Sequence, residues 1–324
     1  MLSLELALNN ILSPAILFFV LGVVAVLINS ELEIPDSIGT AITLFVLIAI
    51  GLEAGVAVNK TGIREVIVPV ITAILIGISI SSFVYFIMSK LGFDSSNAGS
   101  IAGHYGACSS VTLTTAIVFL KQIGANFEEF VPALYPFMDT AALIAGIFLG
   151  HAGLEQDTNE DDYNLINILK DSLTSKSTVA ILGSFIIGLI AGQEGTESIM
   201  LFYDDMFKGI FSIFMLDIGL LAGSRISELK EVKPVTFLLA ILLPVFQAVM
   251  TIIITTFIGL SPGGATIFAV LAAGASYISA PAAMRSTFPD ANPSLALGMS
   301  LGIVFPLNVL IGIPLYYQIA VMIS

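Results

Sequence analysis

Charge is what this sequence has least of. Only 11% of its 324 residues are charged, whereas 57% are hydrophobic and the mean hydropathy is +1.02. Soluble domains carry about 25% charged residues, so the composition excludes an ordinary soluble protein. The net charge of −13 does not indicate a nucleic-acid partner and argues against adhesion to anionic lipid. We therefore predict a polytopic protein of the lipid bilayer.

Side chains for metal and enzyme chemistry are scarce as well. The single cysteine, Cys108, excludes an internal disulfide, and two histidines cannot build a histidine-rich metal site. The sequence has no G-x-S-x-G elbow and no G-x-x-x-x-G-K phosphate loop. Asp139 and Asp217 nominally supply the carboxylate pair of an intramembrane protease, but Asp217 stands in LDIGL rather than in a Gly-x-Gly-Asp context. We predict that the protein is not an enzyme and holds no organic cofactor.

Long apolar runs are what the sequence has in abundance. A helix needs about 20 apolar residues to cross a hydrocarbon core of about 30 Å. The sequence predicts an all-α fold whose ten spans cover residues 11–29, 37–58, 66–89, 96–120, 129–150, 177–195, 200–223, 234–259, 264–287 and 293–322. The longest connection, residues 151–176, is acidic and separates a first repeat, 1–150, from a second repeat, 177–324.

The two halves resemble each other. The segment IGLEAG at residues 50–55 recurs as IGLLAG at residues 218–223, an offset of 168. The same offset carries residues 106–109 onto residues 274–277. Five spans per repeat place the repeats in opposite orientations, which predicts an inverted repeat with a binding site near the middle of the bilayer.

Basic residues predict the orientation. One side of the ten spans holds seven of them, Lys90, Lys170, Lys176, Arg225, Lys230, Lys233 and Arg285. The other side holds four, Lys60, Arg64, Lys121 and Lys208. Because basic loops stay in the cytoplasm, the first side is predicted to be cytoplasmic, with both termini outside.

Small and polar residues interrupt spans four and nine at their centres. The stretches are NAGSIAGHYGACSSVTLTT, residues 97–115, and AAGASYISAPAAMRS, residues 272–286. Helix N-termini suit a small anion, and freed carbonyls and hydroxyls suit sodium. We expect spans four, five, nine and ten to move against spans two and seven, whose IGLxAG segments would give smooth packing. The predicted anion ligands are Gly106, Ala107, Ser109, Ser110, Ser276, Tyr277, Ile278 and Ser279.

Acidic residues deep in the spans are the candidates for ion coupling, because a carboxylate is costly within a membrane. Asp139 lies near the middle of span five, and Asn308 lies near the matching position of span ten. Asp217 and Glu53 also lie within spans and are weaker candidates. The predicted sodium ligands are Ser109, Thr112, Asp139, Ser276 and Asn308.

Three segments carry a resemblance to a known family. They are ALYPFMD at residues 133–139, the interrupted centre of span four, and RSTFPDANPSLALGMS at residues 285–300. Through them the chain resembles the sodium-dependent bicarbonate transporter family along essentially its whole length. The resemblance implies symport of bicarbonate with sodium, a homotrimer, a PII-like regulatory partner and a bacterial inner membrane. It assigns the site to Gly106, Ala107, Ser109, Thr112, Asp139, Ser276, Ile278, Ser279 and Pro281.

The chain departs from the family at two positions near the site and in one loop. Val111 stands where the family has a second serine, and Tyr277 stands where it has an aspartate. The loop at residues 151–176 is also shorter. These departures leave two alternatives to sodium–bicarbonate symport: a symporter or exchanger of another small anion, such as a short carboxylate, and a regulated channel or scaffold.

Overall fold

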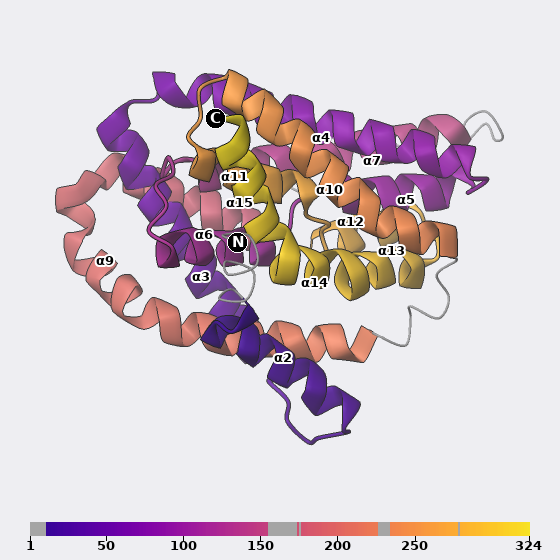
Figure 1. Ribbon diagram of the computed structural model, residues 1–324, viewed down its shortest axis with the longest axis horizontal. Coiled ribbons are helices and arrows are strands. Elements are labelled where there is room, and N and C mark those ends of the chain that lie inside the picture. Colours follow the sequence, from indigo (N-terminus) through magenta and orange to yellow (C-terminus); the bar gives the residue numbers. More distant parts are fainter. Residues whose placement is uncertain (1–10, 155–173, 175, 226–233, 278) are drawn as a thin grey trace.

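The computed structural model describes residues 11–154, 174, 176–225, 234–277 and 279–324, and this part of the chain is helical and contains no strand (Figure 1). The helices of the first half are α2 (Pro14–Leu27), α3 (Asp36–Thr61), α4 (Arg64–Lys90), α5 (Ser95–Gly106), α6 (Ser110–Gln122), the short η1 (Val131–Leu134) and α7 (Tyr135–Leu154). Those of the second half are α9 (Lys176–Arg225), α10 (Pro234–Phe257), α11 (Pro262–Ala273), α12 (Ser279–Thr287), α13 (Pro293–Met299), η3 (Ser300–Val304), α14 (Phe305–Leu307), η4 (Asn308–Gly312) and α15 (Ile313–Ile323).

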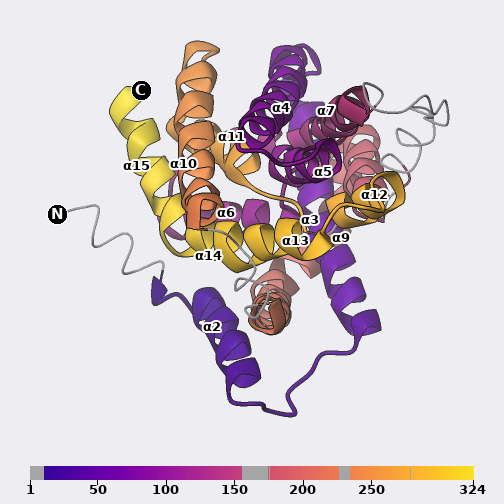
Figure 2. The same ribbon diagram turned by 90° about the vertical axis from the view of Figure 1, so that its right-hand side faces the viewer.

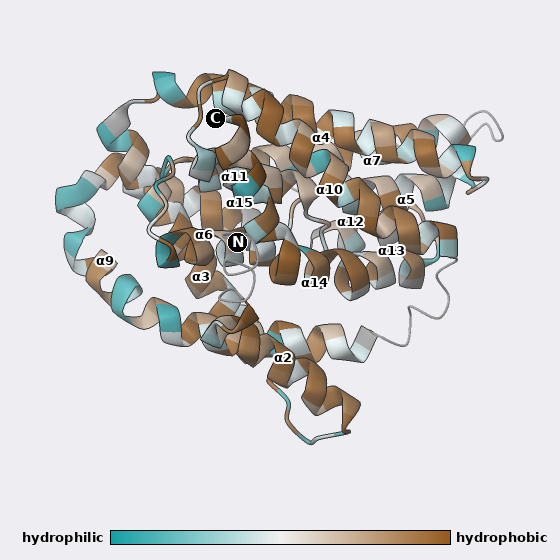
Figure 3. Cartoon of the chain, viewed as in Figure 1, coloured by the Kyte–Doolittle hydropathy of each residue, from teal (hydrophilic) through white to brown (hydrophobic). Residues whose placement is uncertain are grey.

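Most of these helices are apolar along their length, with hydrophilic positions at helix ends, in loops and around the bend of α9 (Figure 3). Within the described residues, six segments are long and apolar enough to cross a bilayer: Asp36–Lys60, Arg64–Lys90, Val131–Leu154, Val179–Ser224, Pro234–Phe257 and Leu295–Ile323. Two shorter apolar helices, α2 and α11, accompany them. The protein is therefore a membrane protein.

Predicted spans six and seven are the two arms of α9, which meet at a kink. The sequence placed the connection between residues 195 and 200, whereas the structure places it at Gly192, where the backbone leaves helical geometry. Gly192 has φ 63° and ψ −169°, a conformation that glycine adopts without a Cβ penalty. The hydroxyl of Thr196 donates to the Gly192 carbonyl (2.7 Å) across the first turn of the second arm. Figure 1 shows α9 bowing around one side of the molecule.

Two smaller differences concern helix boundaries. Span five was predicted to end at residue 150, but α7 continues through His151 to Leu154, where the His151 ring lies 5.1 Å from that of Phe288. The last predicted span is helical but contains two π-helical stretches, η3 and η4. Both π-helical stretches are local widenings of a kind found often at functional sites.

Helices α2, α3 and α9 form one tightly packed group, which we call the scaffold unit. A Cβ at Gly51 or Gly55 of α3 would overlap backbone atoms of the first arm of α9, and a Cβ at Gly188 would overlap α3 in return. The second arm meets α2 in the same way through Gly22 and Gly219. The IGLxAG segments were expected to give smooth packing against spans four, five, nine and ten, but their glycines lie against other scaffold helices and let those helices approach one another.

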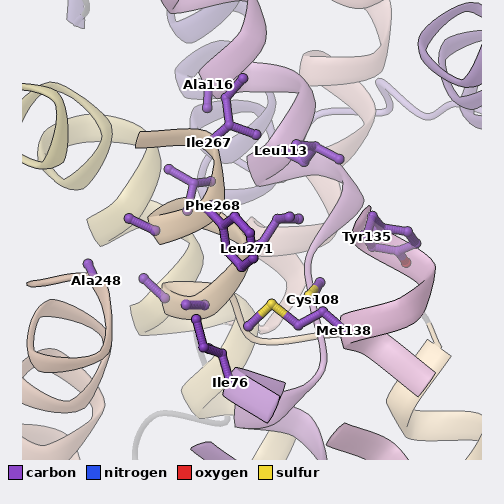
Figure 4. Close-up of a cluster of buried hydrophobic side chains, with 14 of the residues drawn as sticks. Ile76, Cys108, Leu113, Ala116, Tyr135, Met138, Ala248, Ile267, Phe268 and Leu271 are labelled. Carbon is purple, nitrogen blue, oxygen red and sulfur yellow. The ribbon is translucent and has the colours of Figure 1, made fainter. Parts of the chain in front are cut away.

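The remaining helices, α4 to α7 and α10 to α15, form a second group that we call the crossing unit. Figure 2 shows α2 on one side of the molecule and α4, α10 and α15 on the other. The crossing unit is built around a buried apolar cluster in which Ile76, Leu113, Met138, Ile267, Phe268 and Leu271 converge from α4, α6, α7 and α11 (Figure 4). The hydroxyl of Ser81 on α4 lies 3.2 Å from the Ala102 carbonyl and 2.7 Å from that of Ala142, which ties α4 to α5 and α7.

Candidate functional site

The helix of predicted span four is interrupted at residues 107–109, which we call the first interruption. α5 ends at Gly106, Ala107 and Ser109 are extended, and α6 begins at Ser110. Gly106 is needed because a Cβ there would overlap the Ser81 hydroxyl. The Ser109 hydroxyl accepts from the Thr112 N–H (3.2 Å) and from the Thr112 hydroxyl (2.9 Å), which caps the new helix.

The second interruption, residues 274–277, lies between α11 and α12. Gly274 is extended (φ −68°, ψ 159°), and the Ser276 hydroxyl accepts from the Ala280 N–H at 3.2 Å, within the first turn of α12. The Tyr277 ring packs edge-on against Phe305 (5.6 Å between centroids) and is buried. Its hydroxyl lies near Ser109 without completing a hydrogen bond of ordinary geometry. Ile278 lies outside the described residues.

The two interruptions touch each other in the interior. The Ser276 N–H donates to the His104 carbonyl (2.8 Å) and to the Ala107 carbonyl (3.1 Å). A Cβ at Gly274 would lie 3.0 Å from the Ser109 nitrogen, so the two backbones also pass closely at that point. Residues 169 and 172 positions apart are thus joined through their main chains, in a region where every backbone group needs a partner.

Each interruption is tied to a later helix of its own half. Asp139 of α7, which is only 1% exposed, accepts from the Cys108 N–H at 2.8 Å. Asn308, in the last helical segment, donates its amide to the Ala273 carbonyl (2.7 Å) and accepts from the Tyr316 hydroxyl (2.7 Å). A carboxylate therefore accepts a hydrogen bond at the first interruption, while an amide donates one at the second.

The structure brings most of the predicted site residues together. Six of their side chains are no more than 5% exposed and belong to the two interruptions or the helices tied to them: Ser109, Ser110, Thr112, Asp139, Ser276 and Asn308. The N–H groups of Ala107, Cys108 and Ser276 already donate to Gly103, to Asp139 and to the first interruption. These three groups hold the two interruptions in place.

The two weaker acidic candidates for ion coupling lie elsewhere. Asp217 of α9 lies against the first turn of α3, where a Cβ at Gly39 would come 2.6 Å from a carboxylate oxygen. Glu53 of α3 forms an ion pair with Lys121 of α6 (2.7 Å). Neither carboxylate is placed beside Asp139 at the first interruption. The structure therefore separates three acidic residues that were grouped in the sequence because all lie within predicted spans.

Sequence reasoning missed the contacts that fix the ends of the interrupted helices. The Glu128 carboxylate accepts from the N–H (2.7 Å) and the hydroxyl (2.9 Å) of Ser261, the N-cap of α11. In the other half the Asn292 N–H donates to the Asn97 side chain (2.9 Å) in the first turn of α5. A capping signal at Ser261-Pro262 was visible in the sequence, but the partner 133 residues away was not.

Comparison with known families identifies the chain. Residues 14–321 match the Na+-dependent bicarbonate transporter superfamily. The protein belongs to this superfamily. Among curated proteins, none matches the sequence closely enough to be counted as a relative. In this member of the superfamily, the matched range contains both interruptions, Asp139 and Asn308.

Proposed function

We propose that the protein is a secondary active transporter that carries bicarbonate into the cell together with sodium by alternating access. One observation carries the proposal: the Ser276 N–H bonds to the His104 and Ala107 carbonyls, so two helix interruptions meet inside an apolar protein. An open backbone at membrane depth is tolerated only where protein or water covers it, and such crossings are where transporters bind their cargo. Superfamily membership supports the choice of sodium and bicarbonate.

The packing of the scaffold unit supports the inverted repeat of ten spans. Gly51 contacts Ile181, and Gly55, one turn later, contacts Phe185. Because the residue numbers of both helices increase in the same direction, α3 runs parallel to the first arm of α9. Gly219, which is 168 residues after Gly51, meets Phe19 and Gly22 on α2 in the same manner. Duplication of one five-span unit would produce this pair of contacts. Span two corresponds to span seven and span six to span one, so the contact between spans two and six corresponds to the contact between spans seven and one.

The site residues take the following roles in this proposal. Asp139, which bonds to the first interruption at Cys108, supplies the negative charge that binds sodium. The hydroxyl oxygens of Ser109 and Thr112 supply further ligands. Asn308 supplies a neutral carbonyl or amide on the second interruption. The anion is held at the N-termini of α6 and α12 by the remaining N–H groups and by the hydroxyls of predicted residues such as Ser110 and Tyr277.

Charge gives the reason for coupling the two ions. Moving one anion inward against 100 mV costs about 2.3 kcal/mol. One sodium ion that moves with bicarbonate cancels this charge and adds the free energy of its own concentration gradient. The crossing unit would carry both ions past the glycine-packed scaffold unit, which is suited to stay rigid because its helices contact through their backbones.

Uptake of labelled bicarbonate into proteoliposomes tests the proposal. We expect an inward sodium gradient to drive accumulation above the external concentration, whereas a potassium gradient of the same size should not. Equal uptake under both gradients would remove the coupling, and uptake that never exceeds the external concentration would favour a channel.

A short carboxylate is the second candidate cargo. Val111 and Tyr277 place an apolar side chain and a phenol in the buried cluster that adjoins both interruptions. Such a lining suits an anion with an apolar end. The serine and the aspartate that the family has at positions 111 and 277 would suit it less well. Formate or acetate that competes with bicarbonate uptake at equal concentration would favour this cargo.

Three further expectations stay predictions. They are the homotrimer, the PII-like regulatory partner, and a bacterial inner membrane location with both termini outside. The loop at residues 155–173, where a cytoplasmic regulator would be expected to bind, lies outside the described residues.

A further inference from the structure

Among the described residues, the scaffold unit and the crossing unit share one ion pair, which lies at the end of α6. Lys121, in the last turn of α6, lies 2.7 Å and 3.0 Å from the two carboxylate oxygens of Glu53 on α3. The side chains are 50% and 30% exposed, so the pair is reached by solvent on one side. It joins a helix of the scaffold unit to a helix of the crossing unit.

The ion pair forms part of the wall of a cavity. A space of about 260 Å³ lies between α3, α6 and α9, lined among others by Ile50, Glu53, Ile117, Lys121, Met200 and Lys208. A neighbouring space of about 370 Å³ shares Glu53 and Met200 with it and continues towards Lys60 and Glu129. Both lie on the side of Lys60, Lys121 and Lys208, which the basic residues predict to be the outer face.

Beyond the ion pair, the path along α6 towards the first interruption becomes apolar. The Thr115 hydroxyl lies 3.7 Å from the Met215 sulfur of α9, and Val111 packs in one cluster with Phe211 and Phe214. Ser109 and Ser110 follow at the start of α6, at 4% and 5% exposure. An ion entering from the cavity would therefore have to separate α6 from α3 and α9 along this line, beginning at Glu53 and Lys121.

We propose that Glu53 and Lys121 form the gate of the outer entry route and that the incoming anion opens it by replacing Glu53 on the Lys121 ammonium. The exchange keeps the Lys121 ammonium paired, because one monovalent anion takes the place of one carboxylate, and the released Glu53 carboxylate turns to the solvent that already reaches it. The lysine also stands at the C-terminal end of α6, where a positive charge is favoured. This inference rests on the proposed function, since it assigns an entry route to the same site. Lys121 would contact the incoming anion itself, whereas Glu53 is a positioning residue, because it acts by holding Lys121 and α6 in place.

Accessibility of a thiol behind the gate tests the proposal without measuring transport. Cys108, the single cysteine, is replaced by Ala, and Thr115→Cys introduces a reporter that is 3% exposed at the α6–α9 contact. A membrane-impermeant maleimide is then added to right-side-out and inside-out vesicles, and the labelling rate is measured with no sodium or bicarbonate gradient. We expect Glu53→Gln and Lys121→Gln each to speed labelling about twofold to fivefold from one side only, the range for a partly exposed ion pair.

Two controls separate the ion pair from the charge of the cavity. The double variant Glu53→Lys with Lys121→Glu should return the rate towards that of the parent, because the pair forms in reverse. Asp204→Asn removes a carboxylate that lines the same cavity and should leave the rate unchanged. Unchanged labelling in the single variants, fast labelling in the double variant, or a rise with Asp204→Asn would each overturn the gate.

The same experiment distinguishes the gate from the cargo. If labelling follows the expected pattern while the proteoliposomes fail to accumulate bicarbonate, the gate stands and the proposed cargo is wrong. If bicarbonate is accumulated with sodium while the labelling rate is the same in the parent and in the Glu53 and Lys121 variants, the transport proposal stands and the gate is wrong.

Discussion

The first interruption is held by a carboxylate and the second by an amide. Asp139 accepts from the Cys108 N–H, whereas Asn308 donates to the Ala273 carbonyl. The two side chains stand 169 residues apart, at nearly the offset that relates the two halves. The N-caps of the helices that precede the two interruptions also differ in charge. The N-cap of α5 is Asp94, a carboxylic acid, and that of α11 is Ser261, which is neutral.

The two interruptions share one feature and differ in another. In both, a serine hydroxyl accepts from an N–H of the following helix, Ser109 in one and Ser276 in the other, although the offset of 168 pairs Ser276 with Cys108. The neighbouring side chain is a carboxylic acid in the first and a neutral amide in the second. Because buried charges in proteins are paired or bind metal ions, we propose that sodium binds on the side of Asp139 and that Asn308 is a neutral support in the second half.

The largest effect should come from removing the charge of the first half. Asp139→Asn keeps an oxygen for the Cys108 N–H, so the fold should persist, but it removes the negative charge. We expect the apparent sodium affinity to fall about a hundredfold, equivalent to about 2.7 kcal/mol, with a smaller change for bicarbonate. The measurement is uptake against sodium concentration, and unchanged sodium dependence would mean that another residue holds the ion.

Next in size is the effect of filling a glycine contact in the scaffold unit. Gly219→Ala places a methyl group against the Phe19 carbonyl of α2, and overpacking of this kind costs about 2 kcal/mol. Thermal unfolding in detergent should show a lower midpoint. Gly209→Ala is the matched control on the same helix, because a Cβ there has no atom within 4 Å. Similar midpoints for the two variants would mean that the close contact between α2 and α9 is not needed.

A smaller loss is expected from the amide of the second half. Asn308→Ala leaves the Ala273 carbonyl and the Tyr316 hydroxyl without this partner, and an unmet buried group costs about 1.5 kcal/mol. The midpoint of unfolding should fall while the apparent sodium affinity changes little. A sodium affinity that falls as far as in Asp139→Asn would show that both halves hold the ion.

The smallest effect concerns the helix caps. Burial tends to raise the pKa of Asp94, but hydrogen bonds from Asn97 outweigh it, and the pKa of Asp94 lies below its ordinary value. A carboxyl whose pKa falls on folding stabilises the protein above its unfolded pKa of about 3.9 and loses this contribution as the pH drops further.

Asp94→Ala should therefore destabilise the protein by about 1 kcal/mol at pH 7, and by less below pH 4. Unfolding midpoints at several pH values, compared with those of the parent, check this. A constant difference between the two proteins across pH would show that the carboxylate charge does not matter. Ser261→Ala in the second half should give a loss that does not depend on this titration.

Much of the helical organisation could be predicted from the sequence. Hydropathy located α3, α4, α7 and α10 to within a few residues, because an apolar run in a bilayer has to be a helix. The break between spans six and seven was predicted at residues 196–199, a few residues after its place in the structure, because hydropathy does not show that the backbone turns at Gly192. Of the candidate site, the residue types were visible, but Ser81, the His104 carbonyl and Glu128 were not, since their roles depend on partners far along the chain.

By itself the sequence determined three things: that this chain is a membrane protein, which segments are helical, and which residues could bind an ion within the membrane. These properties follow from local composition and spacing, which act over one or two helical turns. Only the tertiary structure decided that the Ser276 N–H meets the first interruption, that the glycines of α3 face α9, and that Lys121 finds Glu53. Such contacts join residues from 68 to more than 160 positions apart, and their geometry depends on how whole helices pack.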